Sequence, residues 1–410
     1  MPLILGVVLS VAAIAVGGKS SFDRMLVVKP PVIKMPSPNA YDYFVFAGKS
    51  LVDVEHIRKA SLEGTSSESE TATLVEKNQA ALGKLREGLK YDYQQPFKYG
   101  IEAIYPEYNY YRNLSHLLAL ESQVKLSKGD WTGAVDSCQD GLMLGEMVAH
   151  GDSNSVGRLV GIACQKAAGR HIWDAIPQLT SAQAKDAVAR MQDIEKHHFP
   201  LYKSLEREKI SQLLFLQDCF NGKCKDAYVK DWDKLPDQAK IRTINDYTHI
   251  MDQCIRNVQL QYASKPVFPE VKGNSPTTGT EVTPEFILSI IYPVWERFWF
   301  ADTYNQTRKE FLTVSFALQA YHADHGNYPA KLSELCPGYL KSVPDDLFTL
   351  KAPLSYRLDG DKYTLWSVGP DCVNNNGVPV VNPKAKSDTA SEKYYVDQDS
   401  KGDIVAGINM

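Results

Sequence analysis

The chain has 410 residues, which is enough for more than one domain and a large buried core. Hydrophobic residues make up 44% and charged residues 23%, as in ordinary globular proteins, and 45 Lys and Arg nearly balance 49 Asp and Glu. The net charge of −4 and the absence of a long tract of like charge argue against a nucleic-acid partner, because backbone phosphates require a basic surface.

Residues 1–18 are dominated by an uncharged apolar run, P-L-I-L-G-V-V-L-S-V-A-A-I-A-V-G-G, that covers residues 2–18. This run predicts a hydrophobic helix that contacts the membrane, either as an anchor or as a cleaved signal segment. Basic residues follow the run rather than precede it, which leaves the membrane orientation open. Residues 19–38 contain several prolines and predict an extended spacer.

Residues 39–265 show apolar positions at helical spacing almost throughout and predict an all-helical domain of antiparallel hairpins. After a first helix near Tyr41 to Val52, the expected helices cover 71–91, 108–128, 131–149, 154–176, 180–197, 199–220 and 236–264. Residues 266–283 are rich in turn formers and predict a linker.

One helical hairpin has a more specific pattern. Residues 119–144 read A-L-E-S-Q-V-K-L-S-K-G-D-W-T-G-A-V-D-S-C-Q-D-G-L-M-L, with a turn at Gly129-Asp130 and a small packing residue at Ala134. This segment resembles one helix-turn-helix unit of the tetratricopeptide type. Because a solenoid needs several units, the alternative of plain packed hairpins stays open.

Residues 284–410 predict a long helix over 284–324, with a bend possible at Pro293, followed by a small antiparallel meander. The helix runs into H-G-N-Y-P at 325–329, and then come L-S-E-L, a V-P-x-D turn, strands over 354–359 and 362–368, and G-D-I-V at 402–405. This order resembles the C-terminal domain of type II secretion major pseudopilins. The expected fold class is therefore α+β: a hydrophobic N-terminal helix, a helical domain and a pilin-like helix packed on a β-meander.

The pseudopilin resemblance implies a calcium site in the loop after S-V-G-P-D and before the final D-I. The matching residues are Asp371 and Asp403. Calcium takes six to eight oxygen ligands, and three nearby residues could add some of them: Asn374, Asp397 and Asp399. The alternative is a solvated acidic loop. A second metal interpretation, for His322 and His325, is weaker than a helix end capped by Gly326.

The seven cysteines show no C-x-x-C spacing, which argues against a zinc knuckle or a thioredoxin-like motif. In an oxidising compartment three pairs are candidates for disulfides, and buried thiols are the alternative for each. The candidate pairs are Cys138 with Cys164, Cys219 with Cys224, and Cys336 with Cys372, which leaves Cys254 over.

No catalytic motif with specific spacing is present, so we expect a protein that is not an enzyme. Two clusters are the places where a site could still assemble: the carboxylates Glu206, Glu208 and Asp218, for which a solvated face is the simpler explanation, and the tyrosines at 99, 105, 108, 110 and 111, for which helix packing is simpler.

The leading hypothesis is a membrane-tethered protein of the cell envelope, anchored or secreted, with its bulk outside the cytoplasm. It would bind protein partners near a secretion or pilus-like system. The alternatives are a tetratricopeptide-like, peptide-binding adaptor and a secreted enzyme with a site in a helical groove.

Overall fold

The computed structural model describes residues 28–64, 66–100, 103–150, 155–224, 231–271, 283–292 and 295–410. The apolar run at residues 2–18 and most of the expected linker lie outside these ranges. No helix within these ranges combines the length and the apolar character that crossing a membrane requires. Residues 28–38 of the expected spacer form neither helix nor strand.

Helices dominate the described part of the chain. The first group is α2 (Ala40–Lys49), α3 (Val54–Glu63), α4 (Glu68–Lys77), α5 (Gln79–Gly88), α6 (Glu107–Ser127), α7 (Trp131–His150) and α8 (Ser155–Ala168). The second group is α9 (Ile172–Ala175), α10 (Ser181–Lys196), α11 (Leu201–Phe220), α12 (Asp237–Asn257), α13 (Pro284–Ile291), α14 (Trp295–His325) and α15 (Ala390–Lys393). The strands are β1 (Ser355–Asp359), β2 (Lys362–Ser367) and β3 (Ile404–Val405).

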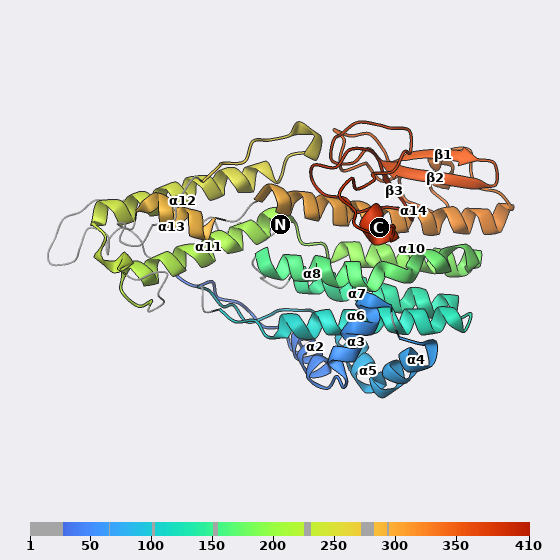
Figure 1. The fold of residues 1–410 in the computed structure, drawn as a ribbon, viewed down its shortest axis with the longest axis horizontal. Coiled ribbons are helices and arrows are strands. Elements are labelled where there is room, and N and C mark those ends of the chain that lie inside the picture. The colour runs from blue at the N-terminus through green and yellow to red at the C-terminus, as the bar shows by residue number, and fades with distance from the viewer. Residues whose placement is uncertain are drawn as a thin grey trace.

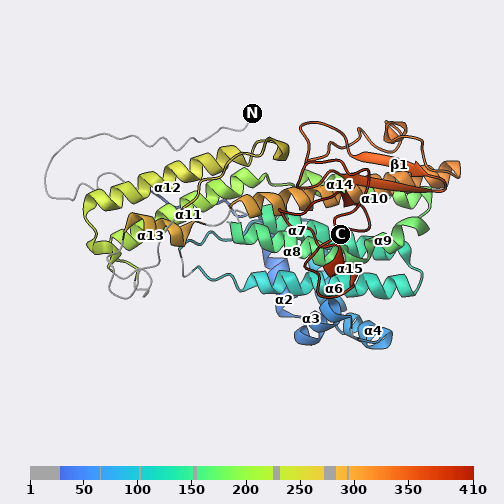
Figure 2. The ribbon, with the colours of Figure 1, turned by 45° about the horizontal axis from the view of Figure 1, so that its top comes forward.

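The long helices run side by side in a stack (Figure 1). Helices α6, α7 and α8 pack on one another, α10 packs against α7 and α14, and α14 also contacts α8. Helices α2 to α5 cover the α6 end of the stack, and the sheet lies over α14 at the other end (Figures 1 and 2). Helices α11, α12 and α13 pack on one another and extend the molecule to one side. The buried apolar residues form one continuous core that includes side chains of α2 as well as of β2 and β3.

Helices α7 and α8 approach closely because glycines line their crossing. A Cβ atom added at Gly161 would lie 2.4 Å from the carbonyl oxygen of Gly145, and one added at Gly141 would lie 2.1 Å from the Cβ atom of Ala168. Helix α8 also packs against α6, so the hairpin formed by α6 and α7 is continued by a third helix.

The expected helix boundaries agree well for α6, α7, α10 and α11. The helix expected at 154–176 is α8 followed by a single 3-10 turn at Gly169–His171 and by α9, and the helix expected at 236–264 ends at Asn257. The segment expected as one helix at 71–91 is two helices, which separate at Asn78. The Asn78 side-chain oxygen accepts a hydrogen bond from the Val52 N–H at 2.9 Å, and the Asn78 side-chain nitrogen donates one to the Val52 carbonyl oxygen at 3.2 Å. These two bonds hold Asn78, whose own backbone is not helical, between the two helices. Helix α3 was not expected at all.

The predicted long helix over 284–324 is also two helices. α13 ends at Ile291, where Tyr292 takes an extended conformation, and α14 begins at Trp295. The residue that precedes a proline is disfavoured in the helical region, and Tyr292 precedes Pro293 in the sequence. α14 ends at His325 as predicted, and Gly326 has the positive φ of +77° that a helix end requires.

The predicted antiparallel sheet is confirmed. In the hairpin of β1 and β2, Ser355 pairs with Trp366 and Asp359 with Lys362, so that Gly360 and Asp361 form a two-residue turn. Gly360 has φ +68°, which suits such a turn. β3 adds a third antiparallel strand beside β2. The coarse α+β class is therefore correct for the described residues.

Candidate functional site

Two buried aspartates hold the C-terminal loops against the sheet. Asp346 accepts hydrogen bonds from the Ser367 hydroxyl at 2.6 Å and from the Val368 N–H at 2.8 Å, at the end of β2. Asp403, just before β3, accepts a hydrogen bond from the Asn375 N–H at 3.0 Å. Each carboxylate therefore ties a loop to a strand, and both side chains are closed off from solvent.

Burial raises the pKa of Asp346 and of Asp403, although backbone N–H donors partly oppose this in both cases. The neighbouring Asp371 raises the pKa of Asp403 further. Asp371 in turn accepts hydrogen bonds from the Gly402 N–H at 3.1 Å and the Val373 N–H at 3.0 Å. Of the predicted calcium ligands, Asp371 and Asp403 thus lie within electrostatic reach of each other and join the same two loops.

The other three predicted ligands have local roles. Asn374 accepts a hydrogen bond from the Trp366 indole N–H at 3.1 Å, and Asp397 accepts one from the Ser400 hydroxyl at 3.1 Å. Asp399 is exposed on the surface. Each side chain closes its own turn or faces solvent rather than pointing to a common centre.

Calcium requires six to eight oxygen ligands around one point. Among the residues that the structure describes, no three side chains of His, Cys, Asp or Glu come together in a group able to hold a metal ion. The oxygens of Asp371 and Asp403 also accept backbone N–H groups, and calcium at these loops stays a prediction. Asp346, which the sequence did not single out, belongs to the V-P-x-D turn, and only the fold shows its closing role.

A second polar cluster lies inside the helical stack and joins α14 to α7 and α10. Lys309 of α14 forms ion pairs with Glu146 of α7 and, at 3.1 Å, with Glu195 of α10. His198 lies 3.8 Å from the Glu146 carboxylate. The side chains of Lys309 and Glu146 are 5% and 3% exposed, so this pair is almost fully removed from water.

Nearer the start of α14, the same face carries a second buried pair. Arg158 of α8 donates to Asp302 at 2.9 Å from its Nε atom and also to the carbonyl oxygen of Phe199. One turn later, Asn305 donates to Gln165 at 2.5 Å. Polar contacts therefore line the inner face of α14 from Asp302 to Lys309. No sequence motif marks them, because each contact joins residues more than forty positions apart.

The electrostatics of this cluster indicate a structural role for Lys309 and Glu146. Burial alone would raise the pKa of Glu146, but the Lys309 ammonium and His198 hold it below its usual range. Burial opposes the charge of Lys309, but Glu146 and Glu195 overcome this and raise its pKa. Both groups thus stay charged near neutral pH and are poorly suited to proton transfer. Glu310 differs, because burial and then Glu195 raise its pKa to about 7.

The remaining sequence candidates have structural surroundings. His322 stacks on Tyr328 with ring centres 4.5 Å apart, and His325 contacts Tyr321 at 4.2 Å, which supports the helix-end interpretation. Glu208 was expected on a solvated face, but it is buried and accepts the Ser155 N–H at 3.1 Å, at the start of α8. A carboxylate there suits the positive end of the helix dipole.

The tyrosine cluster packs a helix corner, as the simpler interpretation predicted. Tyr105 and Tyr108 stack with ring centres 4.9 Å apart, and the Tyr93 hydroxyl donates to the Tyr111 hydroxyl at 3.2 Å. Tyr111 is fully buried and meets Phe44 of α2 edge to face.

The cysteines separate into two kinds. Cys138 and Cys164 are buried as separate thiols, and Cys138 contacts the Ser122 hydroxyl at 3.2 Å. The two candidates of the C-terminal region, Cys336 and Cys372, are also separate and half-buried. Cys219 and Cys224 differ, because their Sγ atoms lie 2.6 Å apart at the end of α11.

No family model, curated protein or solved structure matches this chain.

Proposed function

We propose that this chain is a cell-envelope protein that presents its pseudopilin-like C-terminal sheet and loops to a protein partner, near a secretion or pilus-like system. The support is architectural. The second half of α14 lies beneath a small antiparallel sheet, and the turns before and within that sheet use Gly326 and Gly360, as the pseudopilin pattern predicts. The anchor at residues 2–18 is proposed from its sequence alone.

The observation that carries this proposal is a set of exposed valines on the loop between β2 and β3. Val373, Val378 and Val381 are 54%, 61% and 53% exposed, whereas Val380 between them is buried. Backbone hydrogen bonds of 2.9 Å join Val378 and Val380 to Asp403 and hold this segment in an extended conformation. Single exposed apolar residues are ordinary, but Val378 and Val381 at a fixed segment, with Val373 earlier in the same loop, favour a contact surface for another protein.

The experiment has two stages. The first is fractionation of cells that express the full chain, combined with thiol labelling by a membrane-impermeant reagent applied to intact cells. We expect the chain in the membrane or periplasmic fraction, and the half-buried Cys336 and Cys372 to be the thiols that react first once the outer barrier is opened. A soluble cytoplasmic chain whose cysteines all react only after lysis would refute the envelope assignment.

The second stage tests the valine surface directly. A photo-crosslinking amino acid replaces Val378 in one variant and Lys128, an exposed residue at the far end of α6, in a control variant. We expect a discrete crosslinked product from position 378 only, and the loss of that product when Val381→Asp is added. Equal products from both positions, or none from position 378, would contradict a protein contact at this segment.

Calcium remains a separate proposal for the same loops. The melting temperature of the chain is measured with calcium and with a chelator, for the wild type and for Asp371→Asn. A calcium-dependent rise that Asp371→Asn removes, and that Asp361→Asn in the exposed hairpin turn keeps, is the result expected of a site. An unchanged midpoint in the wild type would exclude it.

A further inference from the structure

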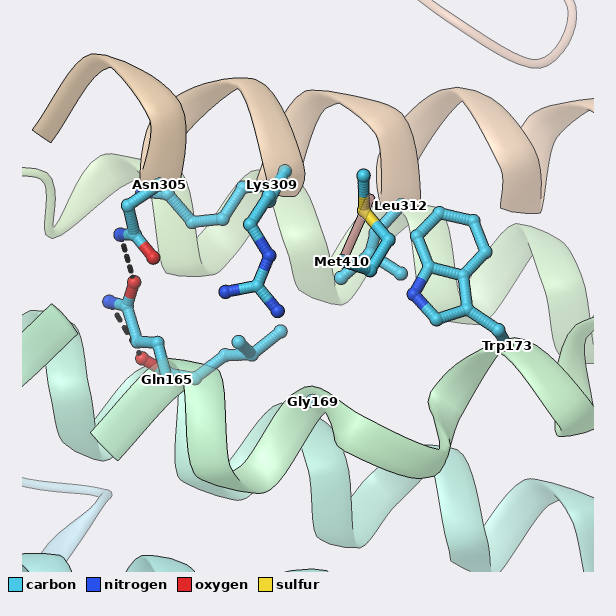
Figure 3. A pocket seen from close by; sticks show the side chains of 9 residues that line it. Gln165, Gly169, Trp173, Asn305, Lys309, Leu312 and Met410 are labelled. Carbon is cyan, nitrogen blue, oxygen red and sulfur yellow. Dashed lines mark hydrogen bonds between the residues drawn. The ribbon is translucent and has the colours of Figure 1, made fainter. Parts of the chain in front are cut away.

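Helix α8 presents one face to solvent, opposite its contacts with the helical stack. On the inner side of α8, Asn305 of α14 donates to Gln165 at 2.5 Å (Figure 3). The cavity at this crossing has a volume of about 10 Å³, the lower limit for a single water molecule, so the crossing offers no room for a ligand. The outward face, called the α8 face below, consists of exposed residues at helical spacing: Val156, Leu159, Ala163 and Lys166, continued by Arg170.

The first half of the α8 face is apolar. Val156 and Leu159 are 49% and 39% exposed, and the exposed Ala163 follows one turn further on. Because these positions are three and four apart, their side chains form one row along the helix. Such a row is the side of an amphipathic helix that normally packs against another element, and in α8 it faces solvent.

The second half of the α8 face is basic, and α6 adds a further cation beside it. Lys166 and Arg170 lie on the face itself, and the exposed Arg112 of α6 acts electrostatically on Cys164 of α8. None of these three cations forms an ion pair with a residue that the structure describes. The Arg170 guanidinium does donate to the carbonyl oxygen of Ser61, but that contact leaves its charge unneutralised.

The charges that act on Lys166 are positive. Partial desolvation lowers the pKa of the Lys166 amine, and the charges of Arg308 and Arg170 lower it further. At His171 the same Arg170 lowers the pKa after burial has done so, and Asp174 opposes this effect.

The neighbouring side of α6 has the same character. Burial lowers the pKa of His116, and the charges of Arg170, Arg58 and Arg112 lower it further. In a chain whose net charge is −4, the α8 face and its α6 border are therefore a local surface of positive potential.

The α8 face adjoins the segment of exposed valines around Val380. The Lys166 amine lies 5.7 Å from the centre of the Tyr395 ring. The Asn409 side chain donates to the carbonyl oxygen of Tyr394 at 3.0 Å and to that of Val380 at 2.9 Å, so it holds these two segments side by side. One partner can therefore contact the exposed valines and the α8 face together.

We propose that the α8 face binds an acidic, amphipathic helical segment of the protein partner. This inference rests on the proposed function for the partner itself and adds the chemistry of its docking segment. The face from residue 156 to residue 170 is about 21 Å long, or about four helical turns. Apolar side chains of the partner pack on Val156 and Leu159, and its carboxylates meet Arg112, Lys166 and Arg170. The apolar part is one row wide, which matches a single helix better than a broad lipid surface.

The test is fluorescence anisotropy of a labelled synthetic peptide titrated with the full-length chain. The peptide has about 18 residues, enough for five helical turns, with leucines at helical spacing and glutamates on the other side. A control peptide carries lysines in place of the glutamates. We expect saturable binding of the glutamate peptide that weakens as the salt concentration rises, and no binding of the lysine peptide. Equal binding of the two peptides, or no binding of either, overturns the proposal.

Substitutions of exposed residues locate the site. Arg112→Gln combined with Lys166→Gln should weaken binding of the glutamate peptide about tenfold, because two exposed ion pairs are lost. Leu159→Asp should weaken it at least as much, because it places a charge in the apolar row. Lys128→Gln, at the far end of α6, is the matched control and should leave the affinity unchanged. Melting curves check that each variant is folded, and wild-type affinity in the first two variants contradicts the proposal.

A lipid surface is the competing outcome, tested with phosphatidylglycerol vesicles. Phosphatidylcholine vesicles give the reference for any binding through residues 2–18. Retention specific to phosphatidylglycerol that Arg112→Gln with Lys166→Gln abolishes, without peptide binding, would assign the α8 face to a membrane and overturn the proposal. Failure here is distinguishable from failure of the proposed function, because a crosslinked product from position 378 without peptide binding refutes only the docking segment.

Discussion

Replacing Lys309 by Met is the sharpest test of how α14 is held in the stack. The Lys309 ammonium contacts Glu146, and the two side chains are 5% and 3% exposed. Methionine fills similar volume but leaves the Glu146 carboxylate buried, with His198 3.8 Å away and with Arg158 acting at longer range. The change therefore breaks a buried pair from one side.

The expected loss can be worked from this geometry. Two unit charges about 3 Å apart attract by about 5 kcal/mol at an effective dielectric of 20. Removing one partner of a buried pair typically costs about 3–5 kcal/mol, because the other charge is left uncompensated. Since Glu146 can take up a proton and the Arg158 charge still acts on it, we expect the low end of this range, about 3 kcal/mol, at pH 8.

The stability loss of Lys309→Met should depend on pH, and the pKa of Glu146 decides in which direction. In the wild type the pKa of Glu146 lies below its usual range, so ionised Glu146 stabilises the folded state. This stabilisation is fully present above the unfolded pKa and is lost only as the pH falls through the lower folded pKa. Without Lys309, burial raises the pKa of Glu146, and the carboxyl group then favours folding only while it is protonated. The deficit of Lys309→Met should therefore be larger at pH 8 than at pH 5.

The assay is urea unfolding of the wild type and the variants at both pH values. Adding Glu146→Gln to Lys309→Met should recover at least half of the loss at pH 8. Lys196→Met, which breaks an exposed pair with Asp193, is the control and should have little effect. A Lys309→Met variant within about 0.5 kcal/mol of the wild type at pH 8, or a deficit that grows at pH 5, would refute the reasoning.

Three further changes test other features. The folded pKa of Glu310 is about 7, above the unfolded value, so protonated Glu310 stabilises the folded state and this stabilisation is lost as the pH rises through 7. In the same urea assay at pH 8, Glu310→Gln should therefore be about 2 kcal/mol more stable than the wild type. Gly161→Ala places a Cβ atom 2.4 Å from the facing carbonyl oxygen of α7 and should lower the free energy of unfolding by about 1–3 kcal/mol. The control Gly83→Ala, with open space around the added atom, should be neutral or stabilising. Equal effects of the two changes would count against the close crossing. With Sγ atoms 2.6 Å apart, Cys219 and Cys224 should form a disulfide when the chain is treated with oxidised glutathione, which is reduced to two glutathione thiols. Mass spectrometry should show that the chain has lost two hydrogens. Alkylation of both thiols after this treatment would contradict the prediction.

Local signals predicted the elements that depend on local physics. The hairpin of β1 and β2 follows from alternating bulky residues and the turn at Gly360, and the end of α14 follows from Gly326. Helix α6 was expected over 108–128 and covers Glu107–Ser127 for the same reason, since its apolar residues recur at helical spacing. The break between α13 and α14 was predicted only as a bend, because the sequence shows the proline but not the backbone conformation around it.

The candidate sites depend on contacts between distant residues, and local patterns do not contain these. Lys309 meets Glu146 across 163 positions of the chain, and Arg158 meets Asp302 across 144. Glu208 was expected in water because its helix carries other charges, but the start of α8 packs over it. The predicted calcium ligands were chosen by their order along the chain, and that order does not say whether backbone N–H groups already occupy their oxygens.

Helix α14 offers one side to α8 and α10 and another side to β2, so it serves as a common wall for the two halves of the molecule. A force applied to the sheet would therefore pass through α14 into the helical layers. The same arrangement limits modular exchange by recombination: a foreign C-terminal piece would have to bring a helix whose rear surface matches Glu146 and Glu195, and a foreign helical half would have to accept Lys309.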